Sequence, residues 1–281
     1  MSIAYLILVH NQPLQLKRLV ERLSGTGIDF YIHVDKKTDL SDFYKSLNLP
    51  NVYFVKKRVK VYWGAYSIIQ ATVNGFNDIV QSGINYDVIN LLSGQDYPLV
   101  SNEYIAGFFS KNKGTAFMEY YSIEKEWKEA IPRLKKYYLT NYPFSGSYRV
   151  EKLMNKFLPG RKPPENIEFV GRSQWFSIGM DHVNYILQFL KKHPSLVHYF
   201  KFTWGSDEFV FQTILYNSPF KDTMVNNNLR YIVWPQGEAS PKTFTIGDAD
   251  NLIHSNKLFA RKFNVQTDKE ILDFLDNNSS H

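Results

Sequence analysis

The chain has 281 residues, of which 33 are basic and 27 acidic, so its formal net charge is +6. Hydrophobic residues make up 44% of the sequence and aromatic residues 16%, which is enough for a sizeable core and leaves rings to stack on sugars or bases. Because the chain has no cysteine, disulfides, thiolate zinc sites and cysteine nucleophiles are excluded.

The first third of the chain alternates apolar runs with helical patterns, which is typical of consecutive βα units. Residues 3–9 form a continuous apolar run, the pattern of a parallel strand that is covered on both faces. Further strands are expected at 29–35, 52–55 and 86–92, and helices at 13–23 and 68–80. The predicted fold class is therefore α/β with a mostly parallel sheet.

The later part of the chain is more mixed. Strands are expected at 114–121 and 166–177, and helices at 124–138, 182–192 and 268–275. Thr267 is the expected cap of the last helix, and a polar tail follows that helix. Residues 141–164 are rich in Pro, Gly, Lys and Arg, which predicts a long loop or lid. No internal repeat or low-complexity linker is present, so we expect one domain over residues 1–281.

The N-terminal run lacks a positive leader and a cleavage site. We therefore expect a buried strand there and not a signal peptide. No apolar run has the length of a membrane span. Together with the lack of cysteine, this favours a reducing cytoplasm.

Basic residues gather at 56–58, 135–136 and 257–262. Such patches favour phosphate-bearing ligands or an anionic membrane surface. For the first two patches, a solvated face is the simpler interpretation. The patches are scattered and no aromatic-basic recognition module accompanies them, so we expect no nucleic-acid partner.

Several common site motifs are missing. The glycine pair at 25–27 lacks the third glycine of a dinucleotide loop, and no Walker loop or nucleophile elbow is present, which argues against NAD enzymes, P-loop enzymes and typical esterases. No two histidines have metal-ligand spacing with a carboxylate, so no metal is expected. Asp248-Ala249-Asp250 matches a metal-binding Asp-x-Asp triplet, but it follows Gly247 in a turn, and we interpret it as a helix start before Leu252.

Polar residues follow three predicted strands. His10, Asp35 and Asp96 come after apolar runs, and in open α/β sheets the ligand crevice lies beyond the carboxyl ends of the strands. Asp35 is placed to accept a hydrogen bond from a base or a ribose. Asp96 lies before Pro98 and is either a turn residue or an acceptor for sugar hydroxyls. We favour the second because the strand end directs it toward the cleft.

Residues 203–215 combine an aromatic loop at Trp204 with an apolar helical pattern. Ser206 is the expected N-cap. Asp207 and Glu208 then lie in the first turn, beside the positive end of the helix dipole. A carboxylate held there is expected to stay ionised and able to take a proton from a hydroxyl. The alternative is that both are ordinary first-turn acids.

Three cationic residues follow later in the chain, namely Lys242, Arg261 and Lys262. Fixed positive charges near the cleft would neutralise a leaving diphosphate without a metal ion. The alternative is a surface helix over 258–263 whose basic side chains are solvated.

Six segments in order resemble one family, the Core-2/I-branching β-1,6-N-acetylglucosaminyltransferases, which also includes peptide O-xylosyltransferases. The matching segments are Val9-His10, 31–35, 92–98, 171–176, 206–208 and 258–263. They extend over nearly the whole chain. The resemblance implies a GT-A-type fold with a Rossmann-like, mostly parallel central sheet flanked by helices. It also implies inverting, metal-independent transfer from a UDP-sugar.

The resemblance also assigns roles to residues. The catalytic base falls on Glu208, and the diphosphate cations fall on Lys262 and on Lys242 or a neighbour of Lys242. Val9 and Asp35 contact the nucleotide, as His10 and Arg261 are expected to do beside them. Asp96, Glu119, Trp175 and Trp204 are expected to line the donor-sugar and acceptor pocket. Residues 1–100 would then be the nucleotide-binding half and 101–281 the acceptor and catalytic half.

The chain departs from the family in lacking its disulfide cysteines and membrane anchor, so it resembles a bacterial, cytoplasmic relative. GlcNAc is the favoured donor sugar and xylose stays open. The expected acceptor is a glycan or a lipid-linked glycan, with peripheral contact at the inner face of an anionic membrane. No cofactor is expected besides the UDP-sugar itself. A non-catalytic carbohydrate-binding protein on the same fold is the main alternative.

Overall fold

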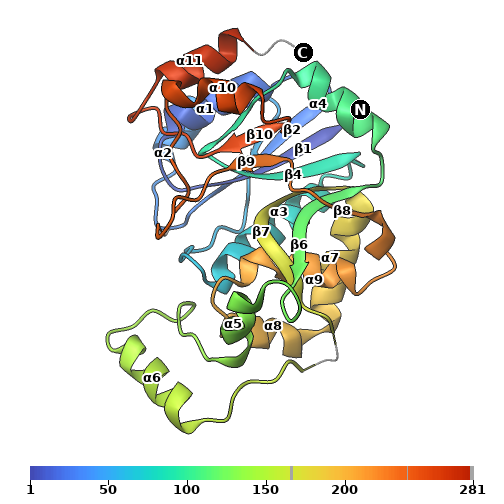
Figure 1. The fold of residues 1–281 in the computed structure, drawn as a ribbon. Coiled ribbons are helices and arrows are strands. Elements are labelled where there is room, and N and C mark those ends of the chain that lie inside the picture. Colours follow the sequence, from blue (N-terminus) through green and yellow to red (C-terminus); the bar gives the residue numbers. More distant parts are fainter. Residues whose placement is uncertain (165–166, 239, 279–281) are drawn as a thin grey trace.

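The structure is a computed structural model that describes residues 1–164, 167–238 and 240–278. A seven-stranded sheet has the strand order β3-β2-β1-β4-β7-β6-β8 (Figure 1). Its strands are β1 (Ile3–Val9), β2 (Ile28–Val34), β3 (Val52–Phe54), β4 (Val88–Ser93), β6 (Ala116–Ser122), β7 (Val170–Ile178) and β8 (Met224–Asn226). A three-stranded sheet contains β5 (Asp96–Pro98), β10 (Phe259–Arg261) and β9 (Arg230–Ile232).

The first strand lies inside the parallel part of the large sheet. β1 pairs in parallel with β2 and with β4, and β2 pairs in parallel with β3. Alternate residues of β1 enter different cores, with Leu6 in one hydrophobic cluster and Tyr5 and Ile7 in the other. The continuous apolar run is explained by this burial on both faces. The predicted α/β class with a mostly parallel sheet is confirmed.

Helices cover the sheet on both sides (Figure 1). The helices are α1 (Pro13–Leu23), α2 (Ser41–Ser46), α3 (Tyr66–Gln81), α4 (Asn102–Lys111), α5 (Ile131–Lys135), α6 (Ser147–Phe157), α7 (Met180–Lys192), α8 (Pro194–Lys201), α9 (Val210–Tyr216), α10 (Ala249–Ile253) and α11 (Glu270–Asn277). α1 buries Leu16, Leu19 and Leu23 in the cluster that contains Tyr5. α3 and α9 bury apolar residues in the cluster that contains Leu6.

Arg230 joins the two sheets. It lies on β9, is 3% exposed, and donates to the carbonyl oxygens of Leu91 on β4 and Phe176 on β7 at 3.1 and 2.9 Å. Buried polar groups normally have hydrogen-bond partners, and the guanidinium is the partner of one carbonyl oxygen on each of these two strands. It fixes the small sheet, and with it β10, beside the carboxyl end of β4.

Three sequence predictions about elements are wrong, and one alternative is excluded. Residues 124–138 form only a 3-10 turn (Lys128–Ala130) and the short α5. Pro132 prevents a longer helix, because proline is not tolerated in a helix interior. The expected loop at 141–164 contains α6. The last helix begins at Glu270, and Asp268, not Thr267, accepts from the N–H of Ile271. Residues 259–261 form a strand, which removes the surface-helix alternative.

Two of the predictions touch residues outside the described ranges. The strand expected from 166 begins at Val170 in the described part, and residue 166 itself lies outside it. The polar tail after α11 lies outside the described residues from 279 onward.

Candidate functional site

Two adjacent hollows in the described part of the chain share the carboxyl end of β1. The first has a volume of about 150 Å³ and extends toward β4 and Arg261. The second, of about 120 Å³, extends toward β2, Asp35 and Gln174. Leu8, Val9 and His10 line both hollows. Val9, His10, Asp35 and Arg261, all expected at a ligand site, are therefore brought together at one sheet edge.

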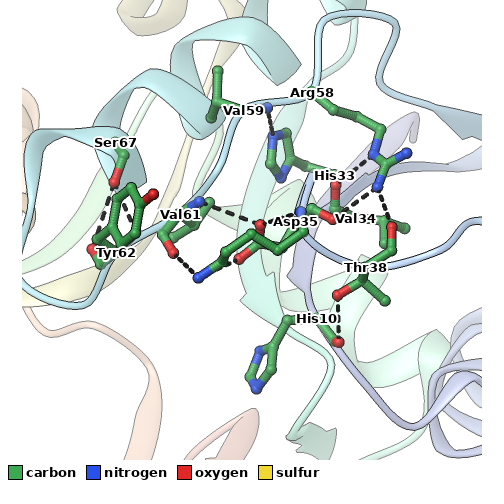
Figure 2. A network of polar contacts seen from close by, with 11 residues as sticks. His10, His33, Val34, Asp35, Thr38, Arg58, Val59, Val61, Tyr62 and Ser67 are labelled. Carbon is green, nitrogen blue, oxygen red and sulfur yellow. Dashed lines mark hydrogen bonds and ion pairs between the residues drawn. The ribbon is translucent and has the colours of Figure 1, made fainter. Parts of the chain in front are cut away.

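Asp35 is held firmly at the rim of the second hollow (Figure 2). Its own N–H donates to the carbonyl of Val9 at 2.8 Å, and its Oδ1 accepts from the N–H groups of Lys37 and Val61 at 2.9 and 3.3 Å. The Lys37 ammonium lies 3.3 Å from Oδ2. The side chain is 8% exposed, so its position is fixed by the loops and little of it faces solvent.

His33 and Arg58 lie beside Asp35 and support the loops around it (Figure 2). The N–H of Val59 donates to His33 Nε2 at 3.2 Å, and burial lowers the pKa of His33 to about 4. The ring is therefore neutral and acts as an acceptor there. Arg58 donates to the carbonyls of Val34, Asp35 and Thr38. The solvated face expected for 56–58 is wrong for Arg58, which is partly buried and bonded to backbone.

The cationic residues meet at the edge of the small sheet. The N–H of Lys262 donates to the carbonyl of Lys242 at 3.3 Å. The Lys242 ammonium is paired with Asp248 at 2.5 Å, whereas within the described ranges the Lys262 ammonium has no ion-pair partner. Asp248 ends a 3-10 turn before α10, as expected of a helix start. Lys262 is thus the cation left available to a ligand.

Arg261 and Asp96 form a buried ion pair. Arg261 Nη1 lies 3.4 Å from Asp96 Oδ1, and the guanidinium stacks on the Trp175 ring at 4.0 Å from its centroid. Asp96 is 1% exposed and also accepts from the N–H and hydroxyl of Ser93 at 3.1 and 3.2 Å. Burial raises the pKa of Asp96 although Arg261 lies beside it. This carboxyl orients Arg261 and the turn, and its expected role as an acceptor for sugar hydroxyls stays a prediction.

Glu208 lies in a 3-10 turn, Ser206–Glu208, that precedes α9. Its Oε2 accepts from Arg133 Nη1, and its side chain is 29% exposed. The Arg133 guanidinium lies over two indole rings, 4.4 Å from Trp204 and 4.9 Å from Trp127. Arg133 therefore holds one oxygen of the carboxylate, while Oε1 has no hydrogen-bond partner among the described residues.

Two glycines allow this arrangement. At Gly171 on β7, an added Cβ would lie 2.4 Å from the carbonyl oxygen of Glu208 and 2.3 Å from the Cβ of Phe209. At Gly205, whose φ is +64°, an added Cβ would lie 2.8 Å from Arg133 Nη1. Only glycine tolerates the positive φ cheaply, and only glycine leaves room for these approaches.

Two expectations about this turn are wrong, namely the side-chain cap by Ser206 and the full ionisation of Asp207. Ser206 makes no side-chain cap, because α9 begins only at Val210. Its hydroxyl and the Asp207 Oδ1 are buried without a hydrogen-bond partner within the described residues. Burial, with a smaller contribution from the Glu208 charge, raises the pKa of Asp207 to about 7. Asp207 is therefore only about half ionised at neutral pH, where full ionisation was expected.

An irregularity in the β6–β7 pairing connects the two ends of the site. Met118 pairs with Phe176 and Tyr120 with Arg172, so Glu119 alone faces residues 173–175. Such bulges re-aim side chains. Gln174 lines the second hollow and Trp175 stacks on Arg261, while Gly171, four residues earlier, contacts the Glu208 turn. At about 3.3 Å per residue, the four-residue interval of β7 from Gly171 to Trp175 separates the two ends by roughly 13 Å.

Glu119 lies at the same bulge. Its Oε2 accepts from Asn228 Nδ2 at 3.0 Å. Burial raises the pKa of Glu119, against the opposing charges of Arg172 and Lys257. It is half-buried, and its expected place in the acceptor pocket stays a prediction.

Sequence reasoning missed three contributors to the site: Arg133, Gln174 and Val61. Arg133 pairs with a residue 75 positions away, and no local pattern signals such a pair. Gln174 lies inside the segment 171–176 that supports the family resemblance, but it was not singled out. Val61 contributes its backbone N–H to Asp35, which no side-chain pattern reveals.

The described residues contain no group of three or more His, Cys, Asp or Glu side chains placed to hold a metal ion. The expected lack of a metal stays a prediction. No helix in the described ranges is long and apolar enough to cross a membrane.

The sequence matches the family model of the Core-2/I-branching enzyme over residues 3–255. Xylosyltransferase 2 of Rattus norvegicus is 28% identical over 303 aligned positions, which cover 98% of this chain and 33% of the relative. A xylosyltransferase of Ciona intestinalis is 26% identical over 98% of this chain and 34% of its own length. The chain thus spans about a third of the length of these curated relatives.

Among solved structures, the apo form of mouse xyloside xylosyltransferase 1 is 11% identical with a TM-score of 0.34. The alignment covers 76% of this chain and 82% of that one. This likeness is too low to support a statement about function.

Proposed function

The chain belongs to the Core-2/I-branching enzyme family, and from that premise we propose that it is an inverting glycosyltransferase. The proposed reaction moves a sugar from a UDP-sugar to a hydroxyl of a glycan acceptor. An α-linked donor would give a β-linked product. The observation that supports this most strongly is that β7 contacts both a cation-bearing hollow and a carboxylate with one unengaged oxygen.

In this proposal the nucleoside occupies the second hollow. Val9 and His10 form its floor at the end of β1, and Asp35 lies at its rim. The main role of Asp35 is to hold the loops at Lys37 and Val61, while the remaining exposed part of its carboxylate can accept from the base or ribose. The pocket is fixed by backbone hydrogen bonds before a ligand binds, which reduces the entropy that binding must offset.

The diphosphate would lie against Arg261 and Lys262. Arg261 lines the first hollow and is held by Asp96 and Trp175, so its orientation is preset. Lys262 adds an ammonium without an ion-pair partner in the described chain. Fixed cations stabilise the charge that develops on the leaving group and need no reorganisation during the reaction. Lys242 is the weaker candidate because Asp248 already engages it.

Glu208 would act as the general base. Its carboxylate takes the proton of the acceptor hydroxyl while that oxygen forms a bond to the anomeric carbon. The bond from the anomeric carbon to the diphosphate oxygen breaks, and its electron pair leaves with UDP. Arg133 is a positioning residue that fixes the carboxylate through Oε2. Trp204, half-buried against Arg133, and Glu119 are proposed to border the acceptor sugar.

The donor sugar is proposed to be GlcNAc, and xylose is the second candidate because the curated relatives are named xylosyltransferases. Metal independence, a glycan or lipid-linked glycan acceptor and a cytoplasmic location are also proposals.

A panel of UDP-sugars tests the function. UDP release is measured for UDP-GlcNAc, UDP-xylose, UDP-glucose and UDP-galactose, each in excess EDTA and with manganese. We expect slow hydrolysis of one donor in EDTA, and no such release by the variant Glu208→Gln. A protein that binds these donors without releasing UDP from any of them is the non-catalytic alternative. Release that disappears in EDTA and returns with manganese would contradict the cation assignment.

A further inference from the structure

Helix α6 (Ser147–Phe157) stands away from the rest of the molecule (Figure 1). None of its residues is buried. A helix of 11 residues is marginal on its own in water, so it needs either packing or a partner surface. The segment between α5 and Arg161, here called the excursion, contains this helix.

One side of α6 is tied to the chain beneath it. Glu151 Oε2 accepts from the N–H of Leu139 at 2.8 Å. Asn155 accepts from the N–H of Tyr137 at 2.8 Å and donates to its carbonyl at 2.7 Å. These four-residue-spaced polar side chains fix how the helix is rotated about its axis.

An apolar stripe lies away from that tied side. Val150, Leu153, Met154 and Phe157 recur at the spacing of one helical face. Val150 is 40% exposed, Leu153 55% and Phe157 72%. Large apolar side chains exposed together on one helix mark an interaction surface.

A basic stripe lies beside the apolar one. Arg149, Lys152 and Lys156 are exposed, and Glu151 is the single acid of the helix. The ammonium groups lie over aromatic rings, with Lys152 Nζ 4.7 Å from the Tyr148 centroid and Lys156 Nζ 5.3 Å from that of Phe157. Lys156 thus borders the apolar stripe at Phe157. Cations beside an apolar face are the pattern of helices that lie in the plane of an anionic membrane surface.

We infer that α6 is a membrane-interface helix that docks this protein on a bilayer with anionic headgroups. The apolar stripe enters the boundary between headgroups and acyl chains, and the three cations of the helix meet lipid phosphates. A second copy of the chain fits less well, because a symmetric contact between two α6 helices would bring like charges together. The inference stands on the surface of α6 and does not require the proposed chemistry.

Docking through α6 would also place the catalytic end near the membrane. Arg133 lies on α5, just before the excursion, and contacts Glu208. Arg161, just after it, donates to the carbonyls of Lys136 and Phe202 at 2.9 and 2.6 Å. One end of the excursion is therefore anchored at the Glu208 turn and the other at the segment that precedes this turn in the chain. An acceptor carried on a lipid would reach the turn from the docked side.

Sedimentation of the full chain with vesicles tests the inference. The probes are phosphatidylcholine vesicles with and without 30% phosphatidylglycerol. We expect binding to the anionic vesicles that weakens at high salt. The pair Leu153→Asp and Phe157→Asp should lower the partition coefficient at least tenfold, and the pair Lys152→Gln and Lys156→Gln should lower it severalfold on anionic vesicles alone.

Matched controls keep the test specific. Leu14→Asp with Ile253→Asp places the same charges at side chains that are 72% and 40% exposed elsewhere. Lys191→Gln with Lys192→Gln removes the same charge from the exposed end of α7. Both control pairs should bind like the unaltered chain. Equal losses in controls and α6 variants, no binding by the unaltered chain, or a dimer that Phe157→Asp dissociates would each overturn the inference.

UDP release in the absence of vesicles separates this result from the proposed function. The α6 variants should keep the rate of the unaltered chain and melt at its temperature. A loss of vesicle binding with unchanged UDP release supports the docking role, whereas an unaltered chain that binds vesicles but releases no UDP from any donor contradicts only the proposed function.

Discussion

The end of the site proposed to bind the nucleotide and the end proposed to carry the catalysis are built in different ways. At the nucleotide end, Asp35 and Arg58 have their hydrogen bonds satisfied by backbone groups of neighbouring strands and loops. At the catalytic end, a 3-10 turn holds Asp207 and Ser206 with buried oxygens that have no partner within the described chain. The polar groups of the first end are thus satisfied without a ligand, while the second end carries an energetic cost in the turn that holds Glu208.

The largest expected effect comes from Glu208→Gln. Removing the general base should lower kcat about 100-fold to 10,000-fold, because the amide cannot take the acceptor proton. UDP affinity, measured by calorimetry, should stay unchanged because Glu208 lies at the other end of β7. Glu103→Gln on α4 makes the same chemical change at an exposed site and should leave kcat intact. Near-normal transfer by Glu208→Gln would remove it from the role of base.

Lys262→Ala should follow, with a loss in kcat/KM of about 100-fold. The reason is that its ammonium is the one proposed to meet the leaving diphosphate. Lys242→Ala should cost less, because that ammonium is already paired with Asp248. Steady-state kinetics of both variants in EDTA give the ranking. A larger loss from Lys242→Ala would reverse the assignment of the two cations.

Arg133→Lys should lower kcat about tenfold with little change in UDP affinity, since lysine lacks the planar fork that stacks between two indoles. The pH profile of kcat should shift as well, because the charge nearest the Glu208 carboxylate changes its geometry. A profile identical to that of the unaltered chain, with lower kcat, would mean that Arg133 only supports the fold.

Asp35→Asn probes the opposite end. It should weaken UDP binding about tenfold, which corresponds to about 1.4 kcal/mol, while kcat at saturating donor stays nearly constant. The amide keeps the shape but loses the charge that pairs with Lys37. An effect on kcat larger than the effect on UDP affinity would show that the two ends are not separable in this way.

The last expected effect is on stability and not on activity, through Asp207→Asn. Between the ordinary carboxyl pKa of about 4 and the raised value of about 7, the folded protein binds more protons than the unfolded chain. The free energy of unfolding therefore falls as pH rises through that window. Asparagine does not ionise, so in the variant Asp207→Asn the free energy of unfolding does not fall for this reason as pH rises.

Thermal melts of Asp207→Asn should thus show a gain over the unaltered chain at pH 8, on the order of 1–3 kcal/mol, and a smaller gain at pH 5. Asp222→Asn, an exposed aspartate, is the matched control and should show no difference between the two pH values. A gain that is equal at both pH values would mean that Asp207 is not protonated in the folded state.

The sequence predicted the nucleotide end far better than the catalytic end. β1 and α1 match their predicted bounds because burial on both faces and helical spacing are visible in local patterns. The expectation that the ligand crevice lies beyond the carboxyl ends of the strands also placed His10 and Asp35 correctly at one edge. The family resemblance is confirmed by the match over residues 3–255.

The catalytic end depends on contacts between distant segments. The close approach of Gly171 to the Glu208 turn and the pairing of Arg133 with Glu208 join residues far apart in the sequence. Tertiary packing there replaces the helix start expected at Ser206 with a 3-10 turn. The chemistry expected at Glu208 stays a prediction, as do the roles of the other site residues.

One experiment tests the proposed transfer most directly, namely proton NMR of the sugar product formed from an α-linked UDP-sugar in excess EDTA. We expect the first product anomer to be β, formed without added metal, because a single displacement assisted by Glu208 and neutralised by Lys262 inverts the anomeric carbon. A first product that is the α anomer, or no product until manganese is restored, would contradict it.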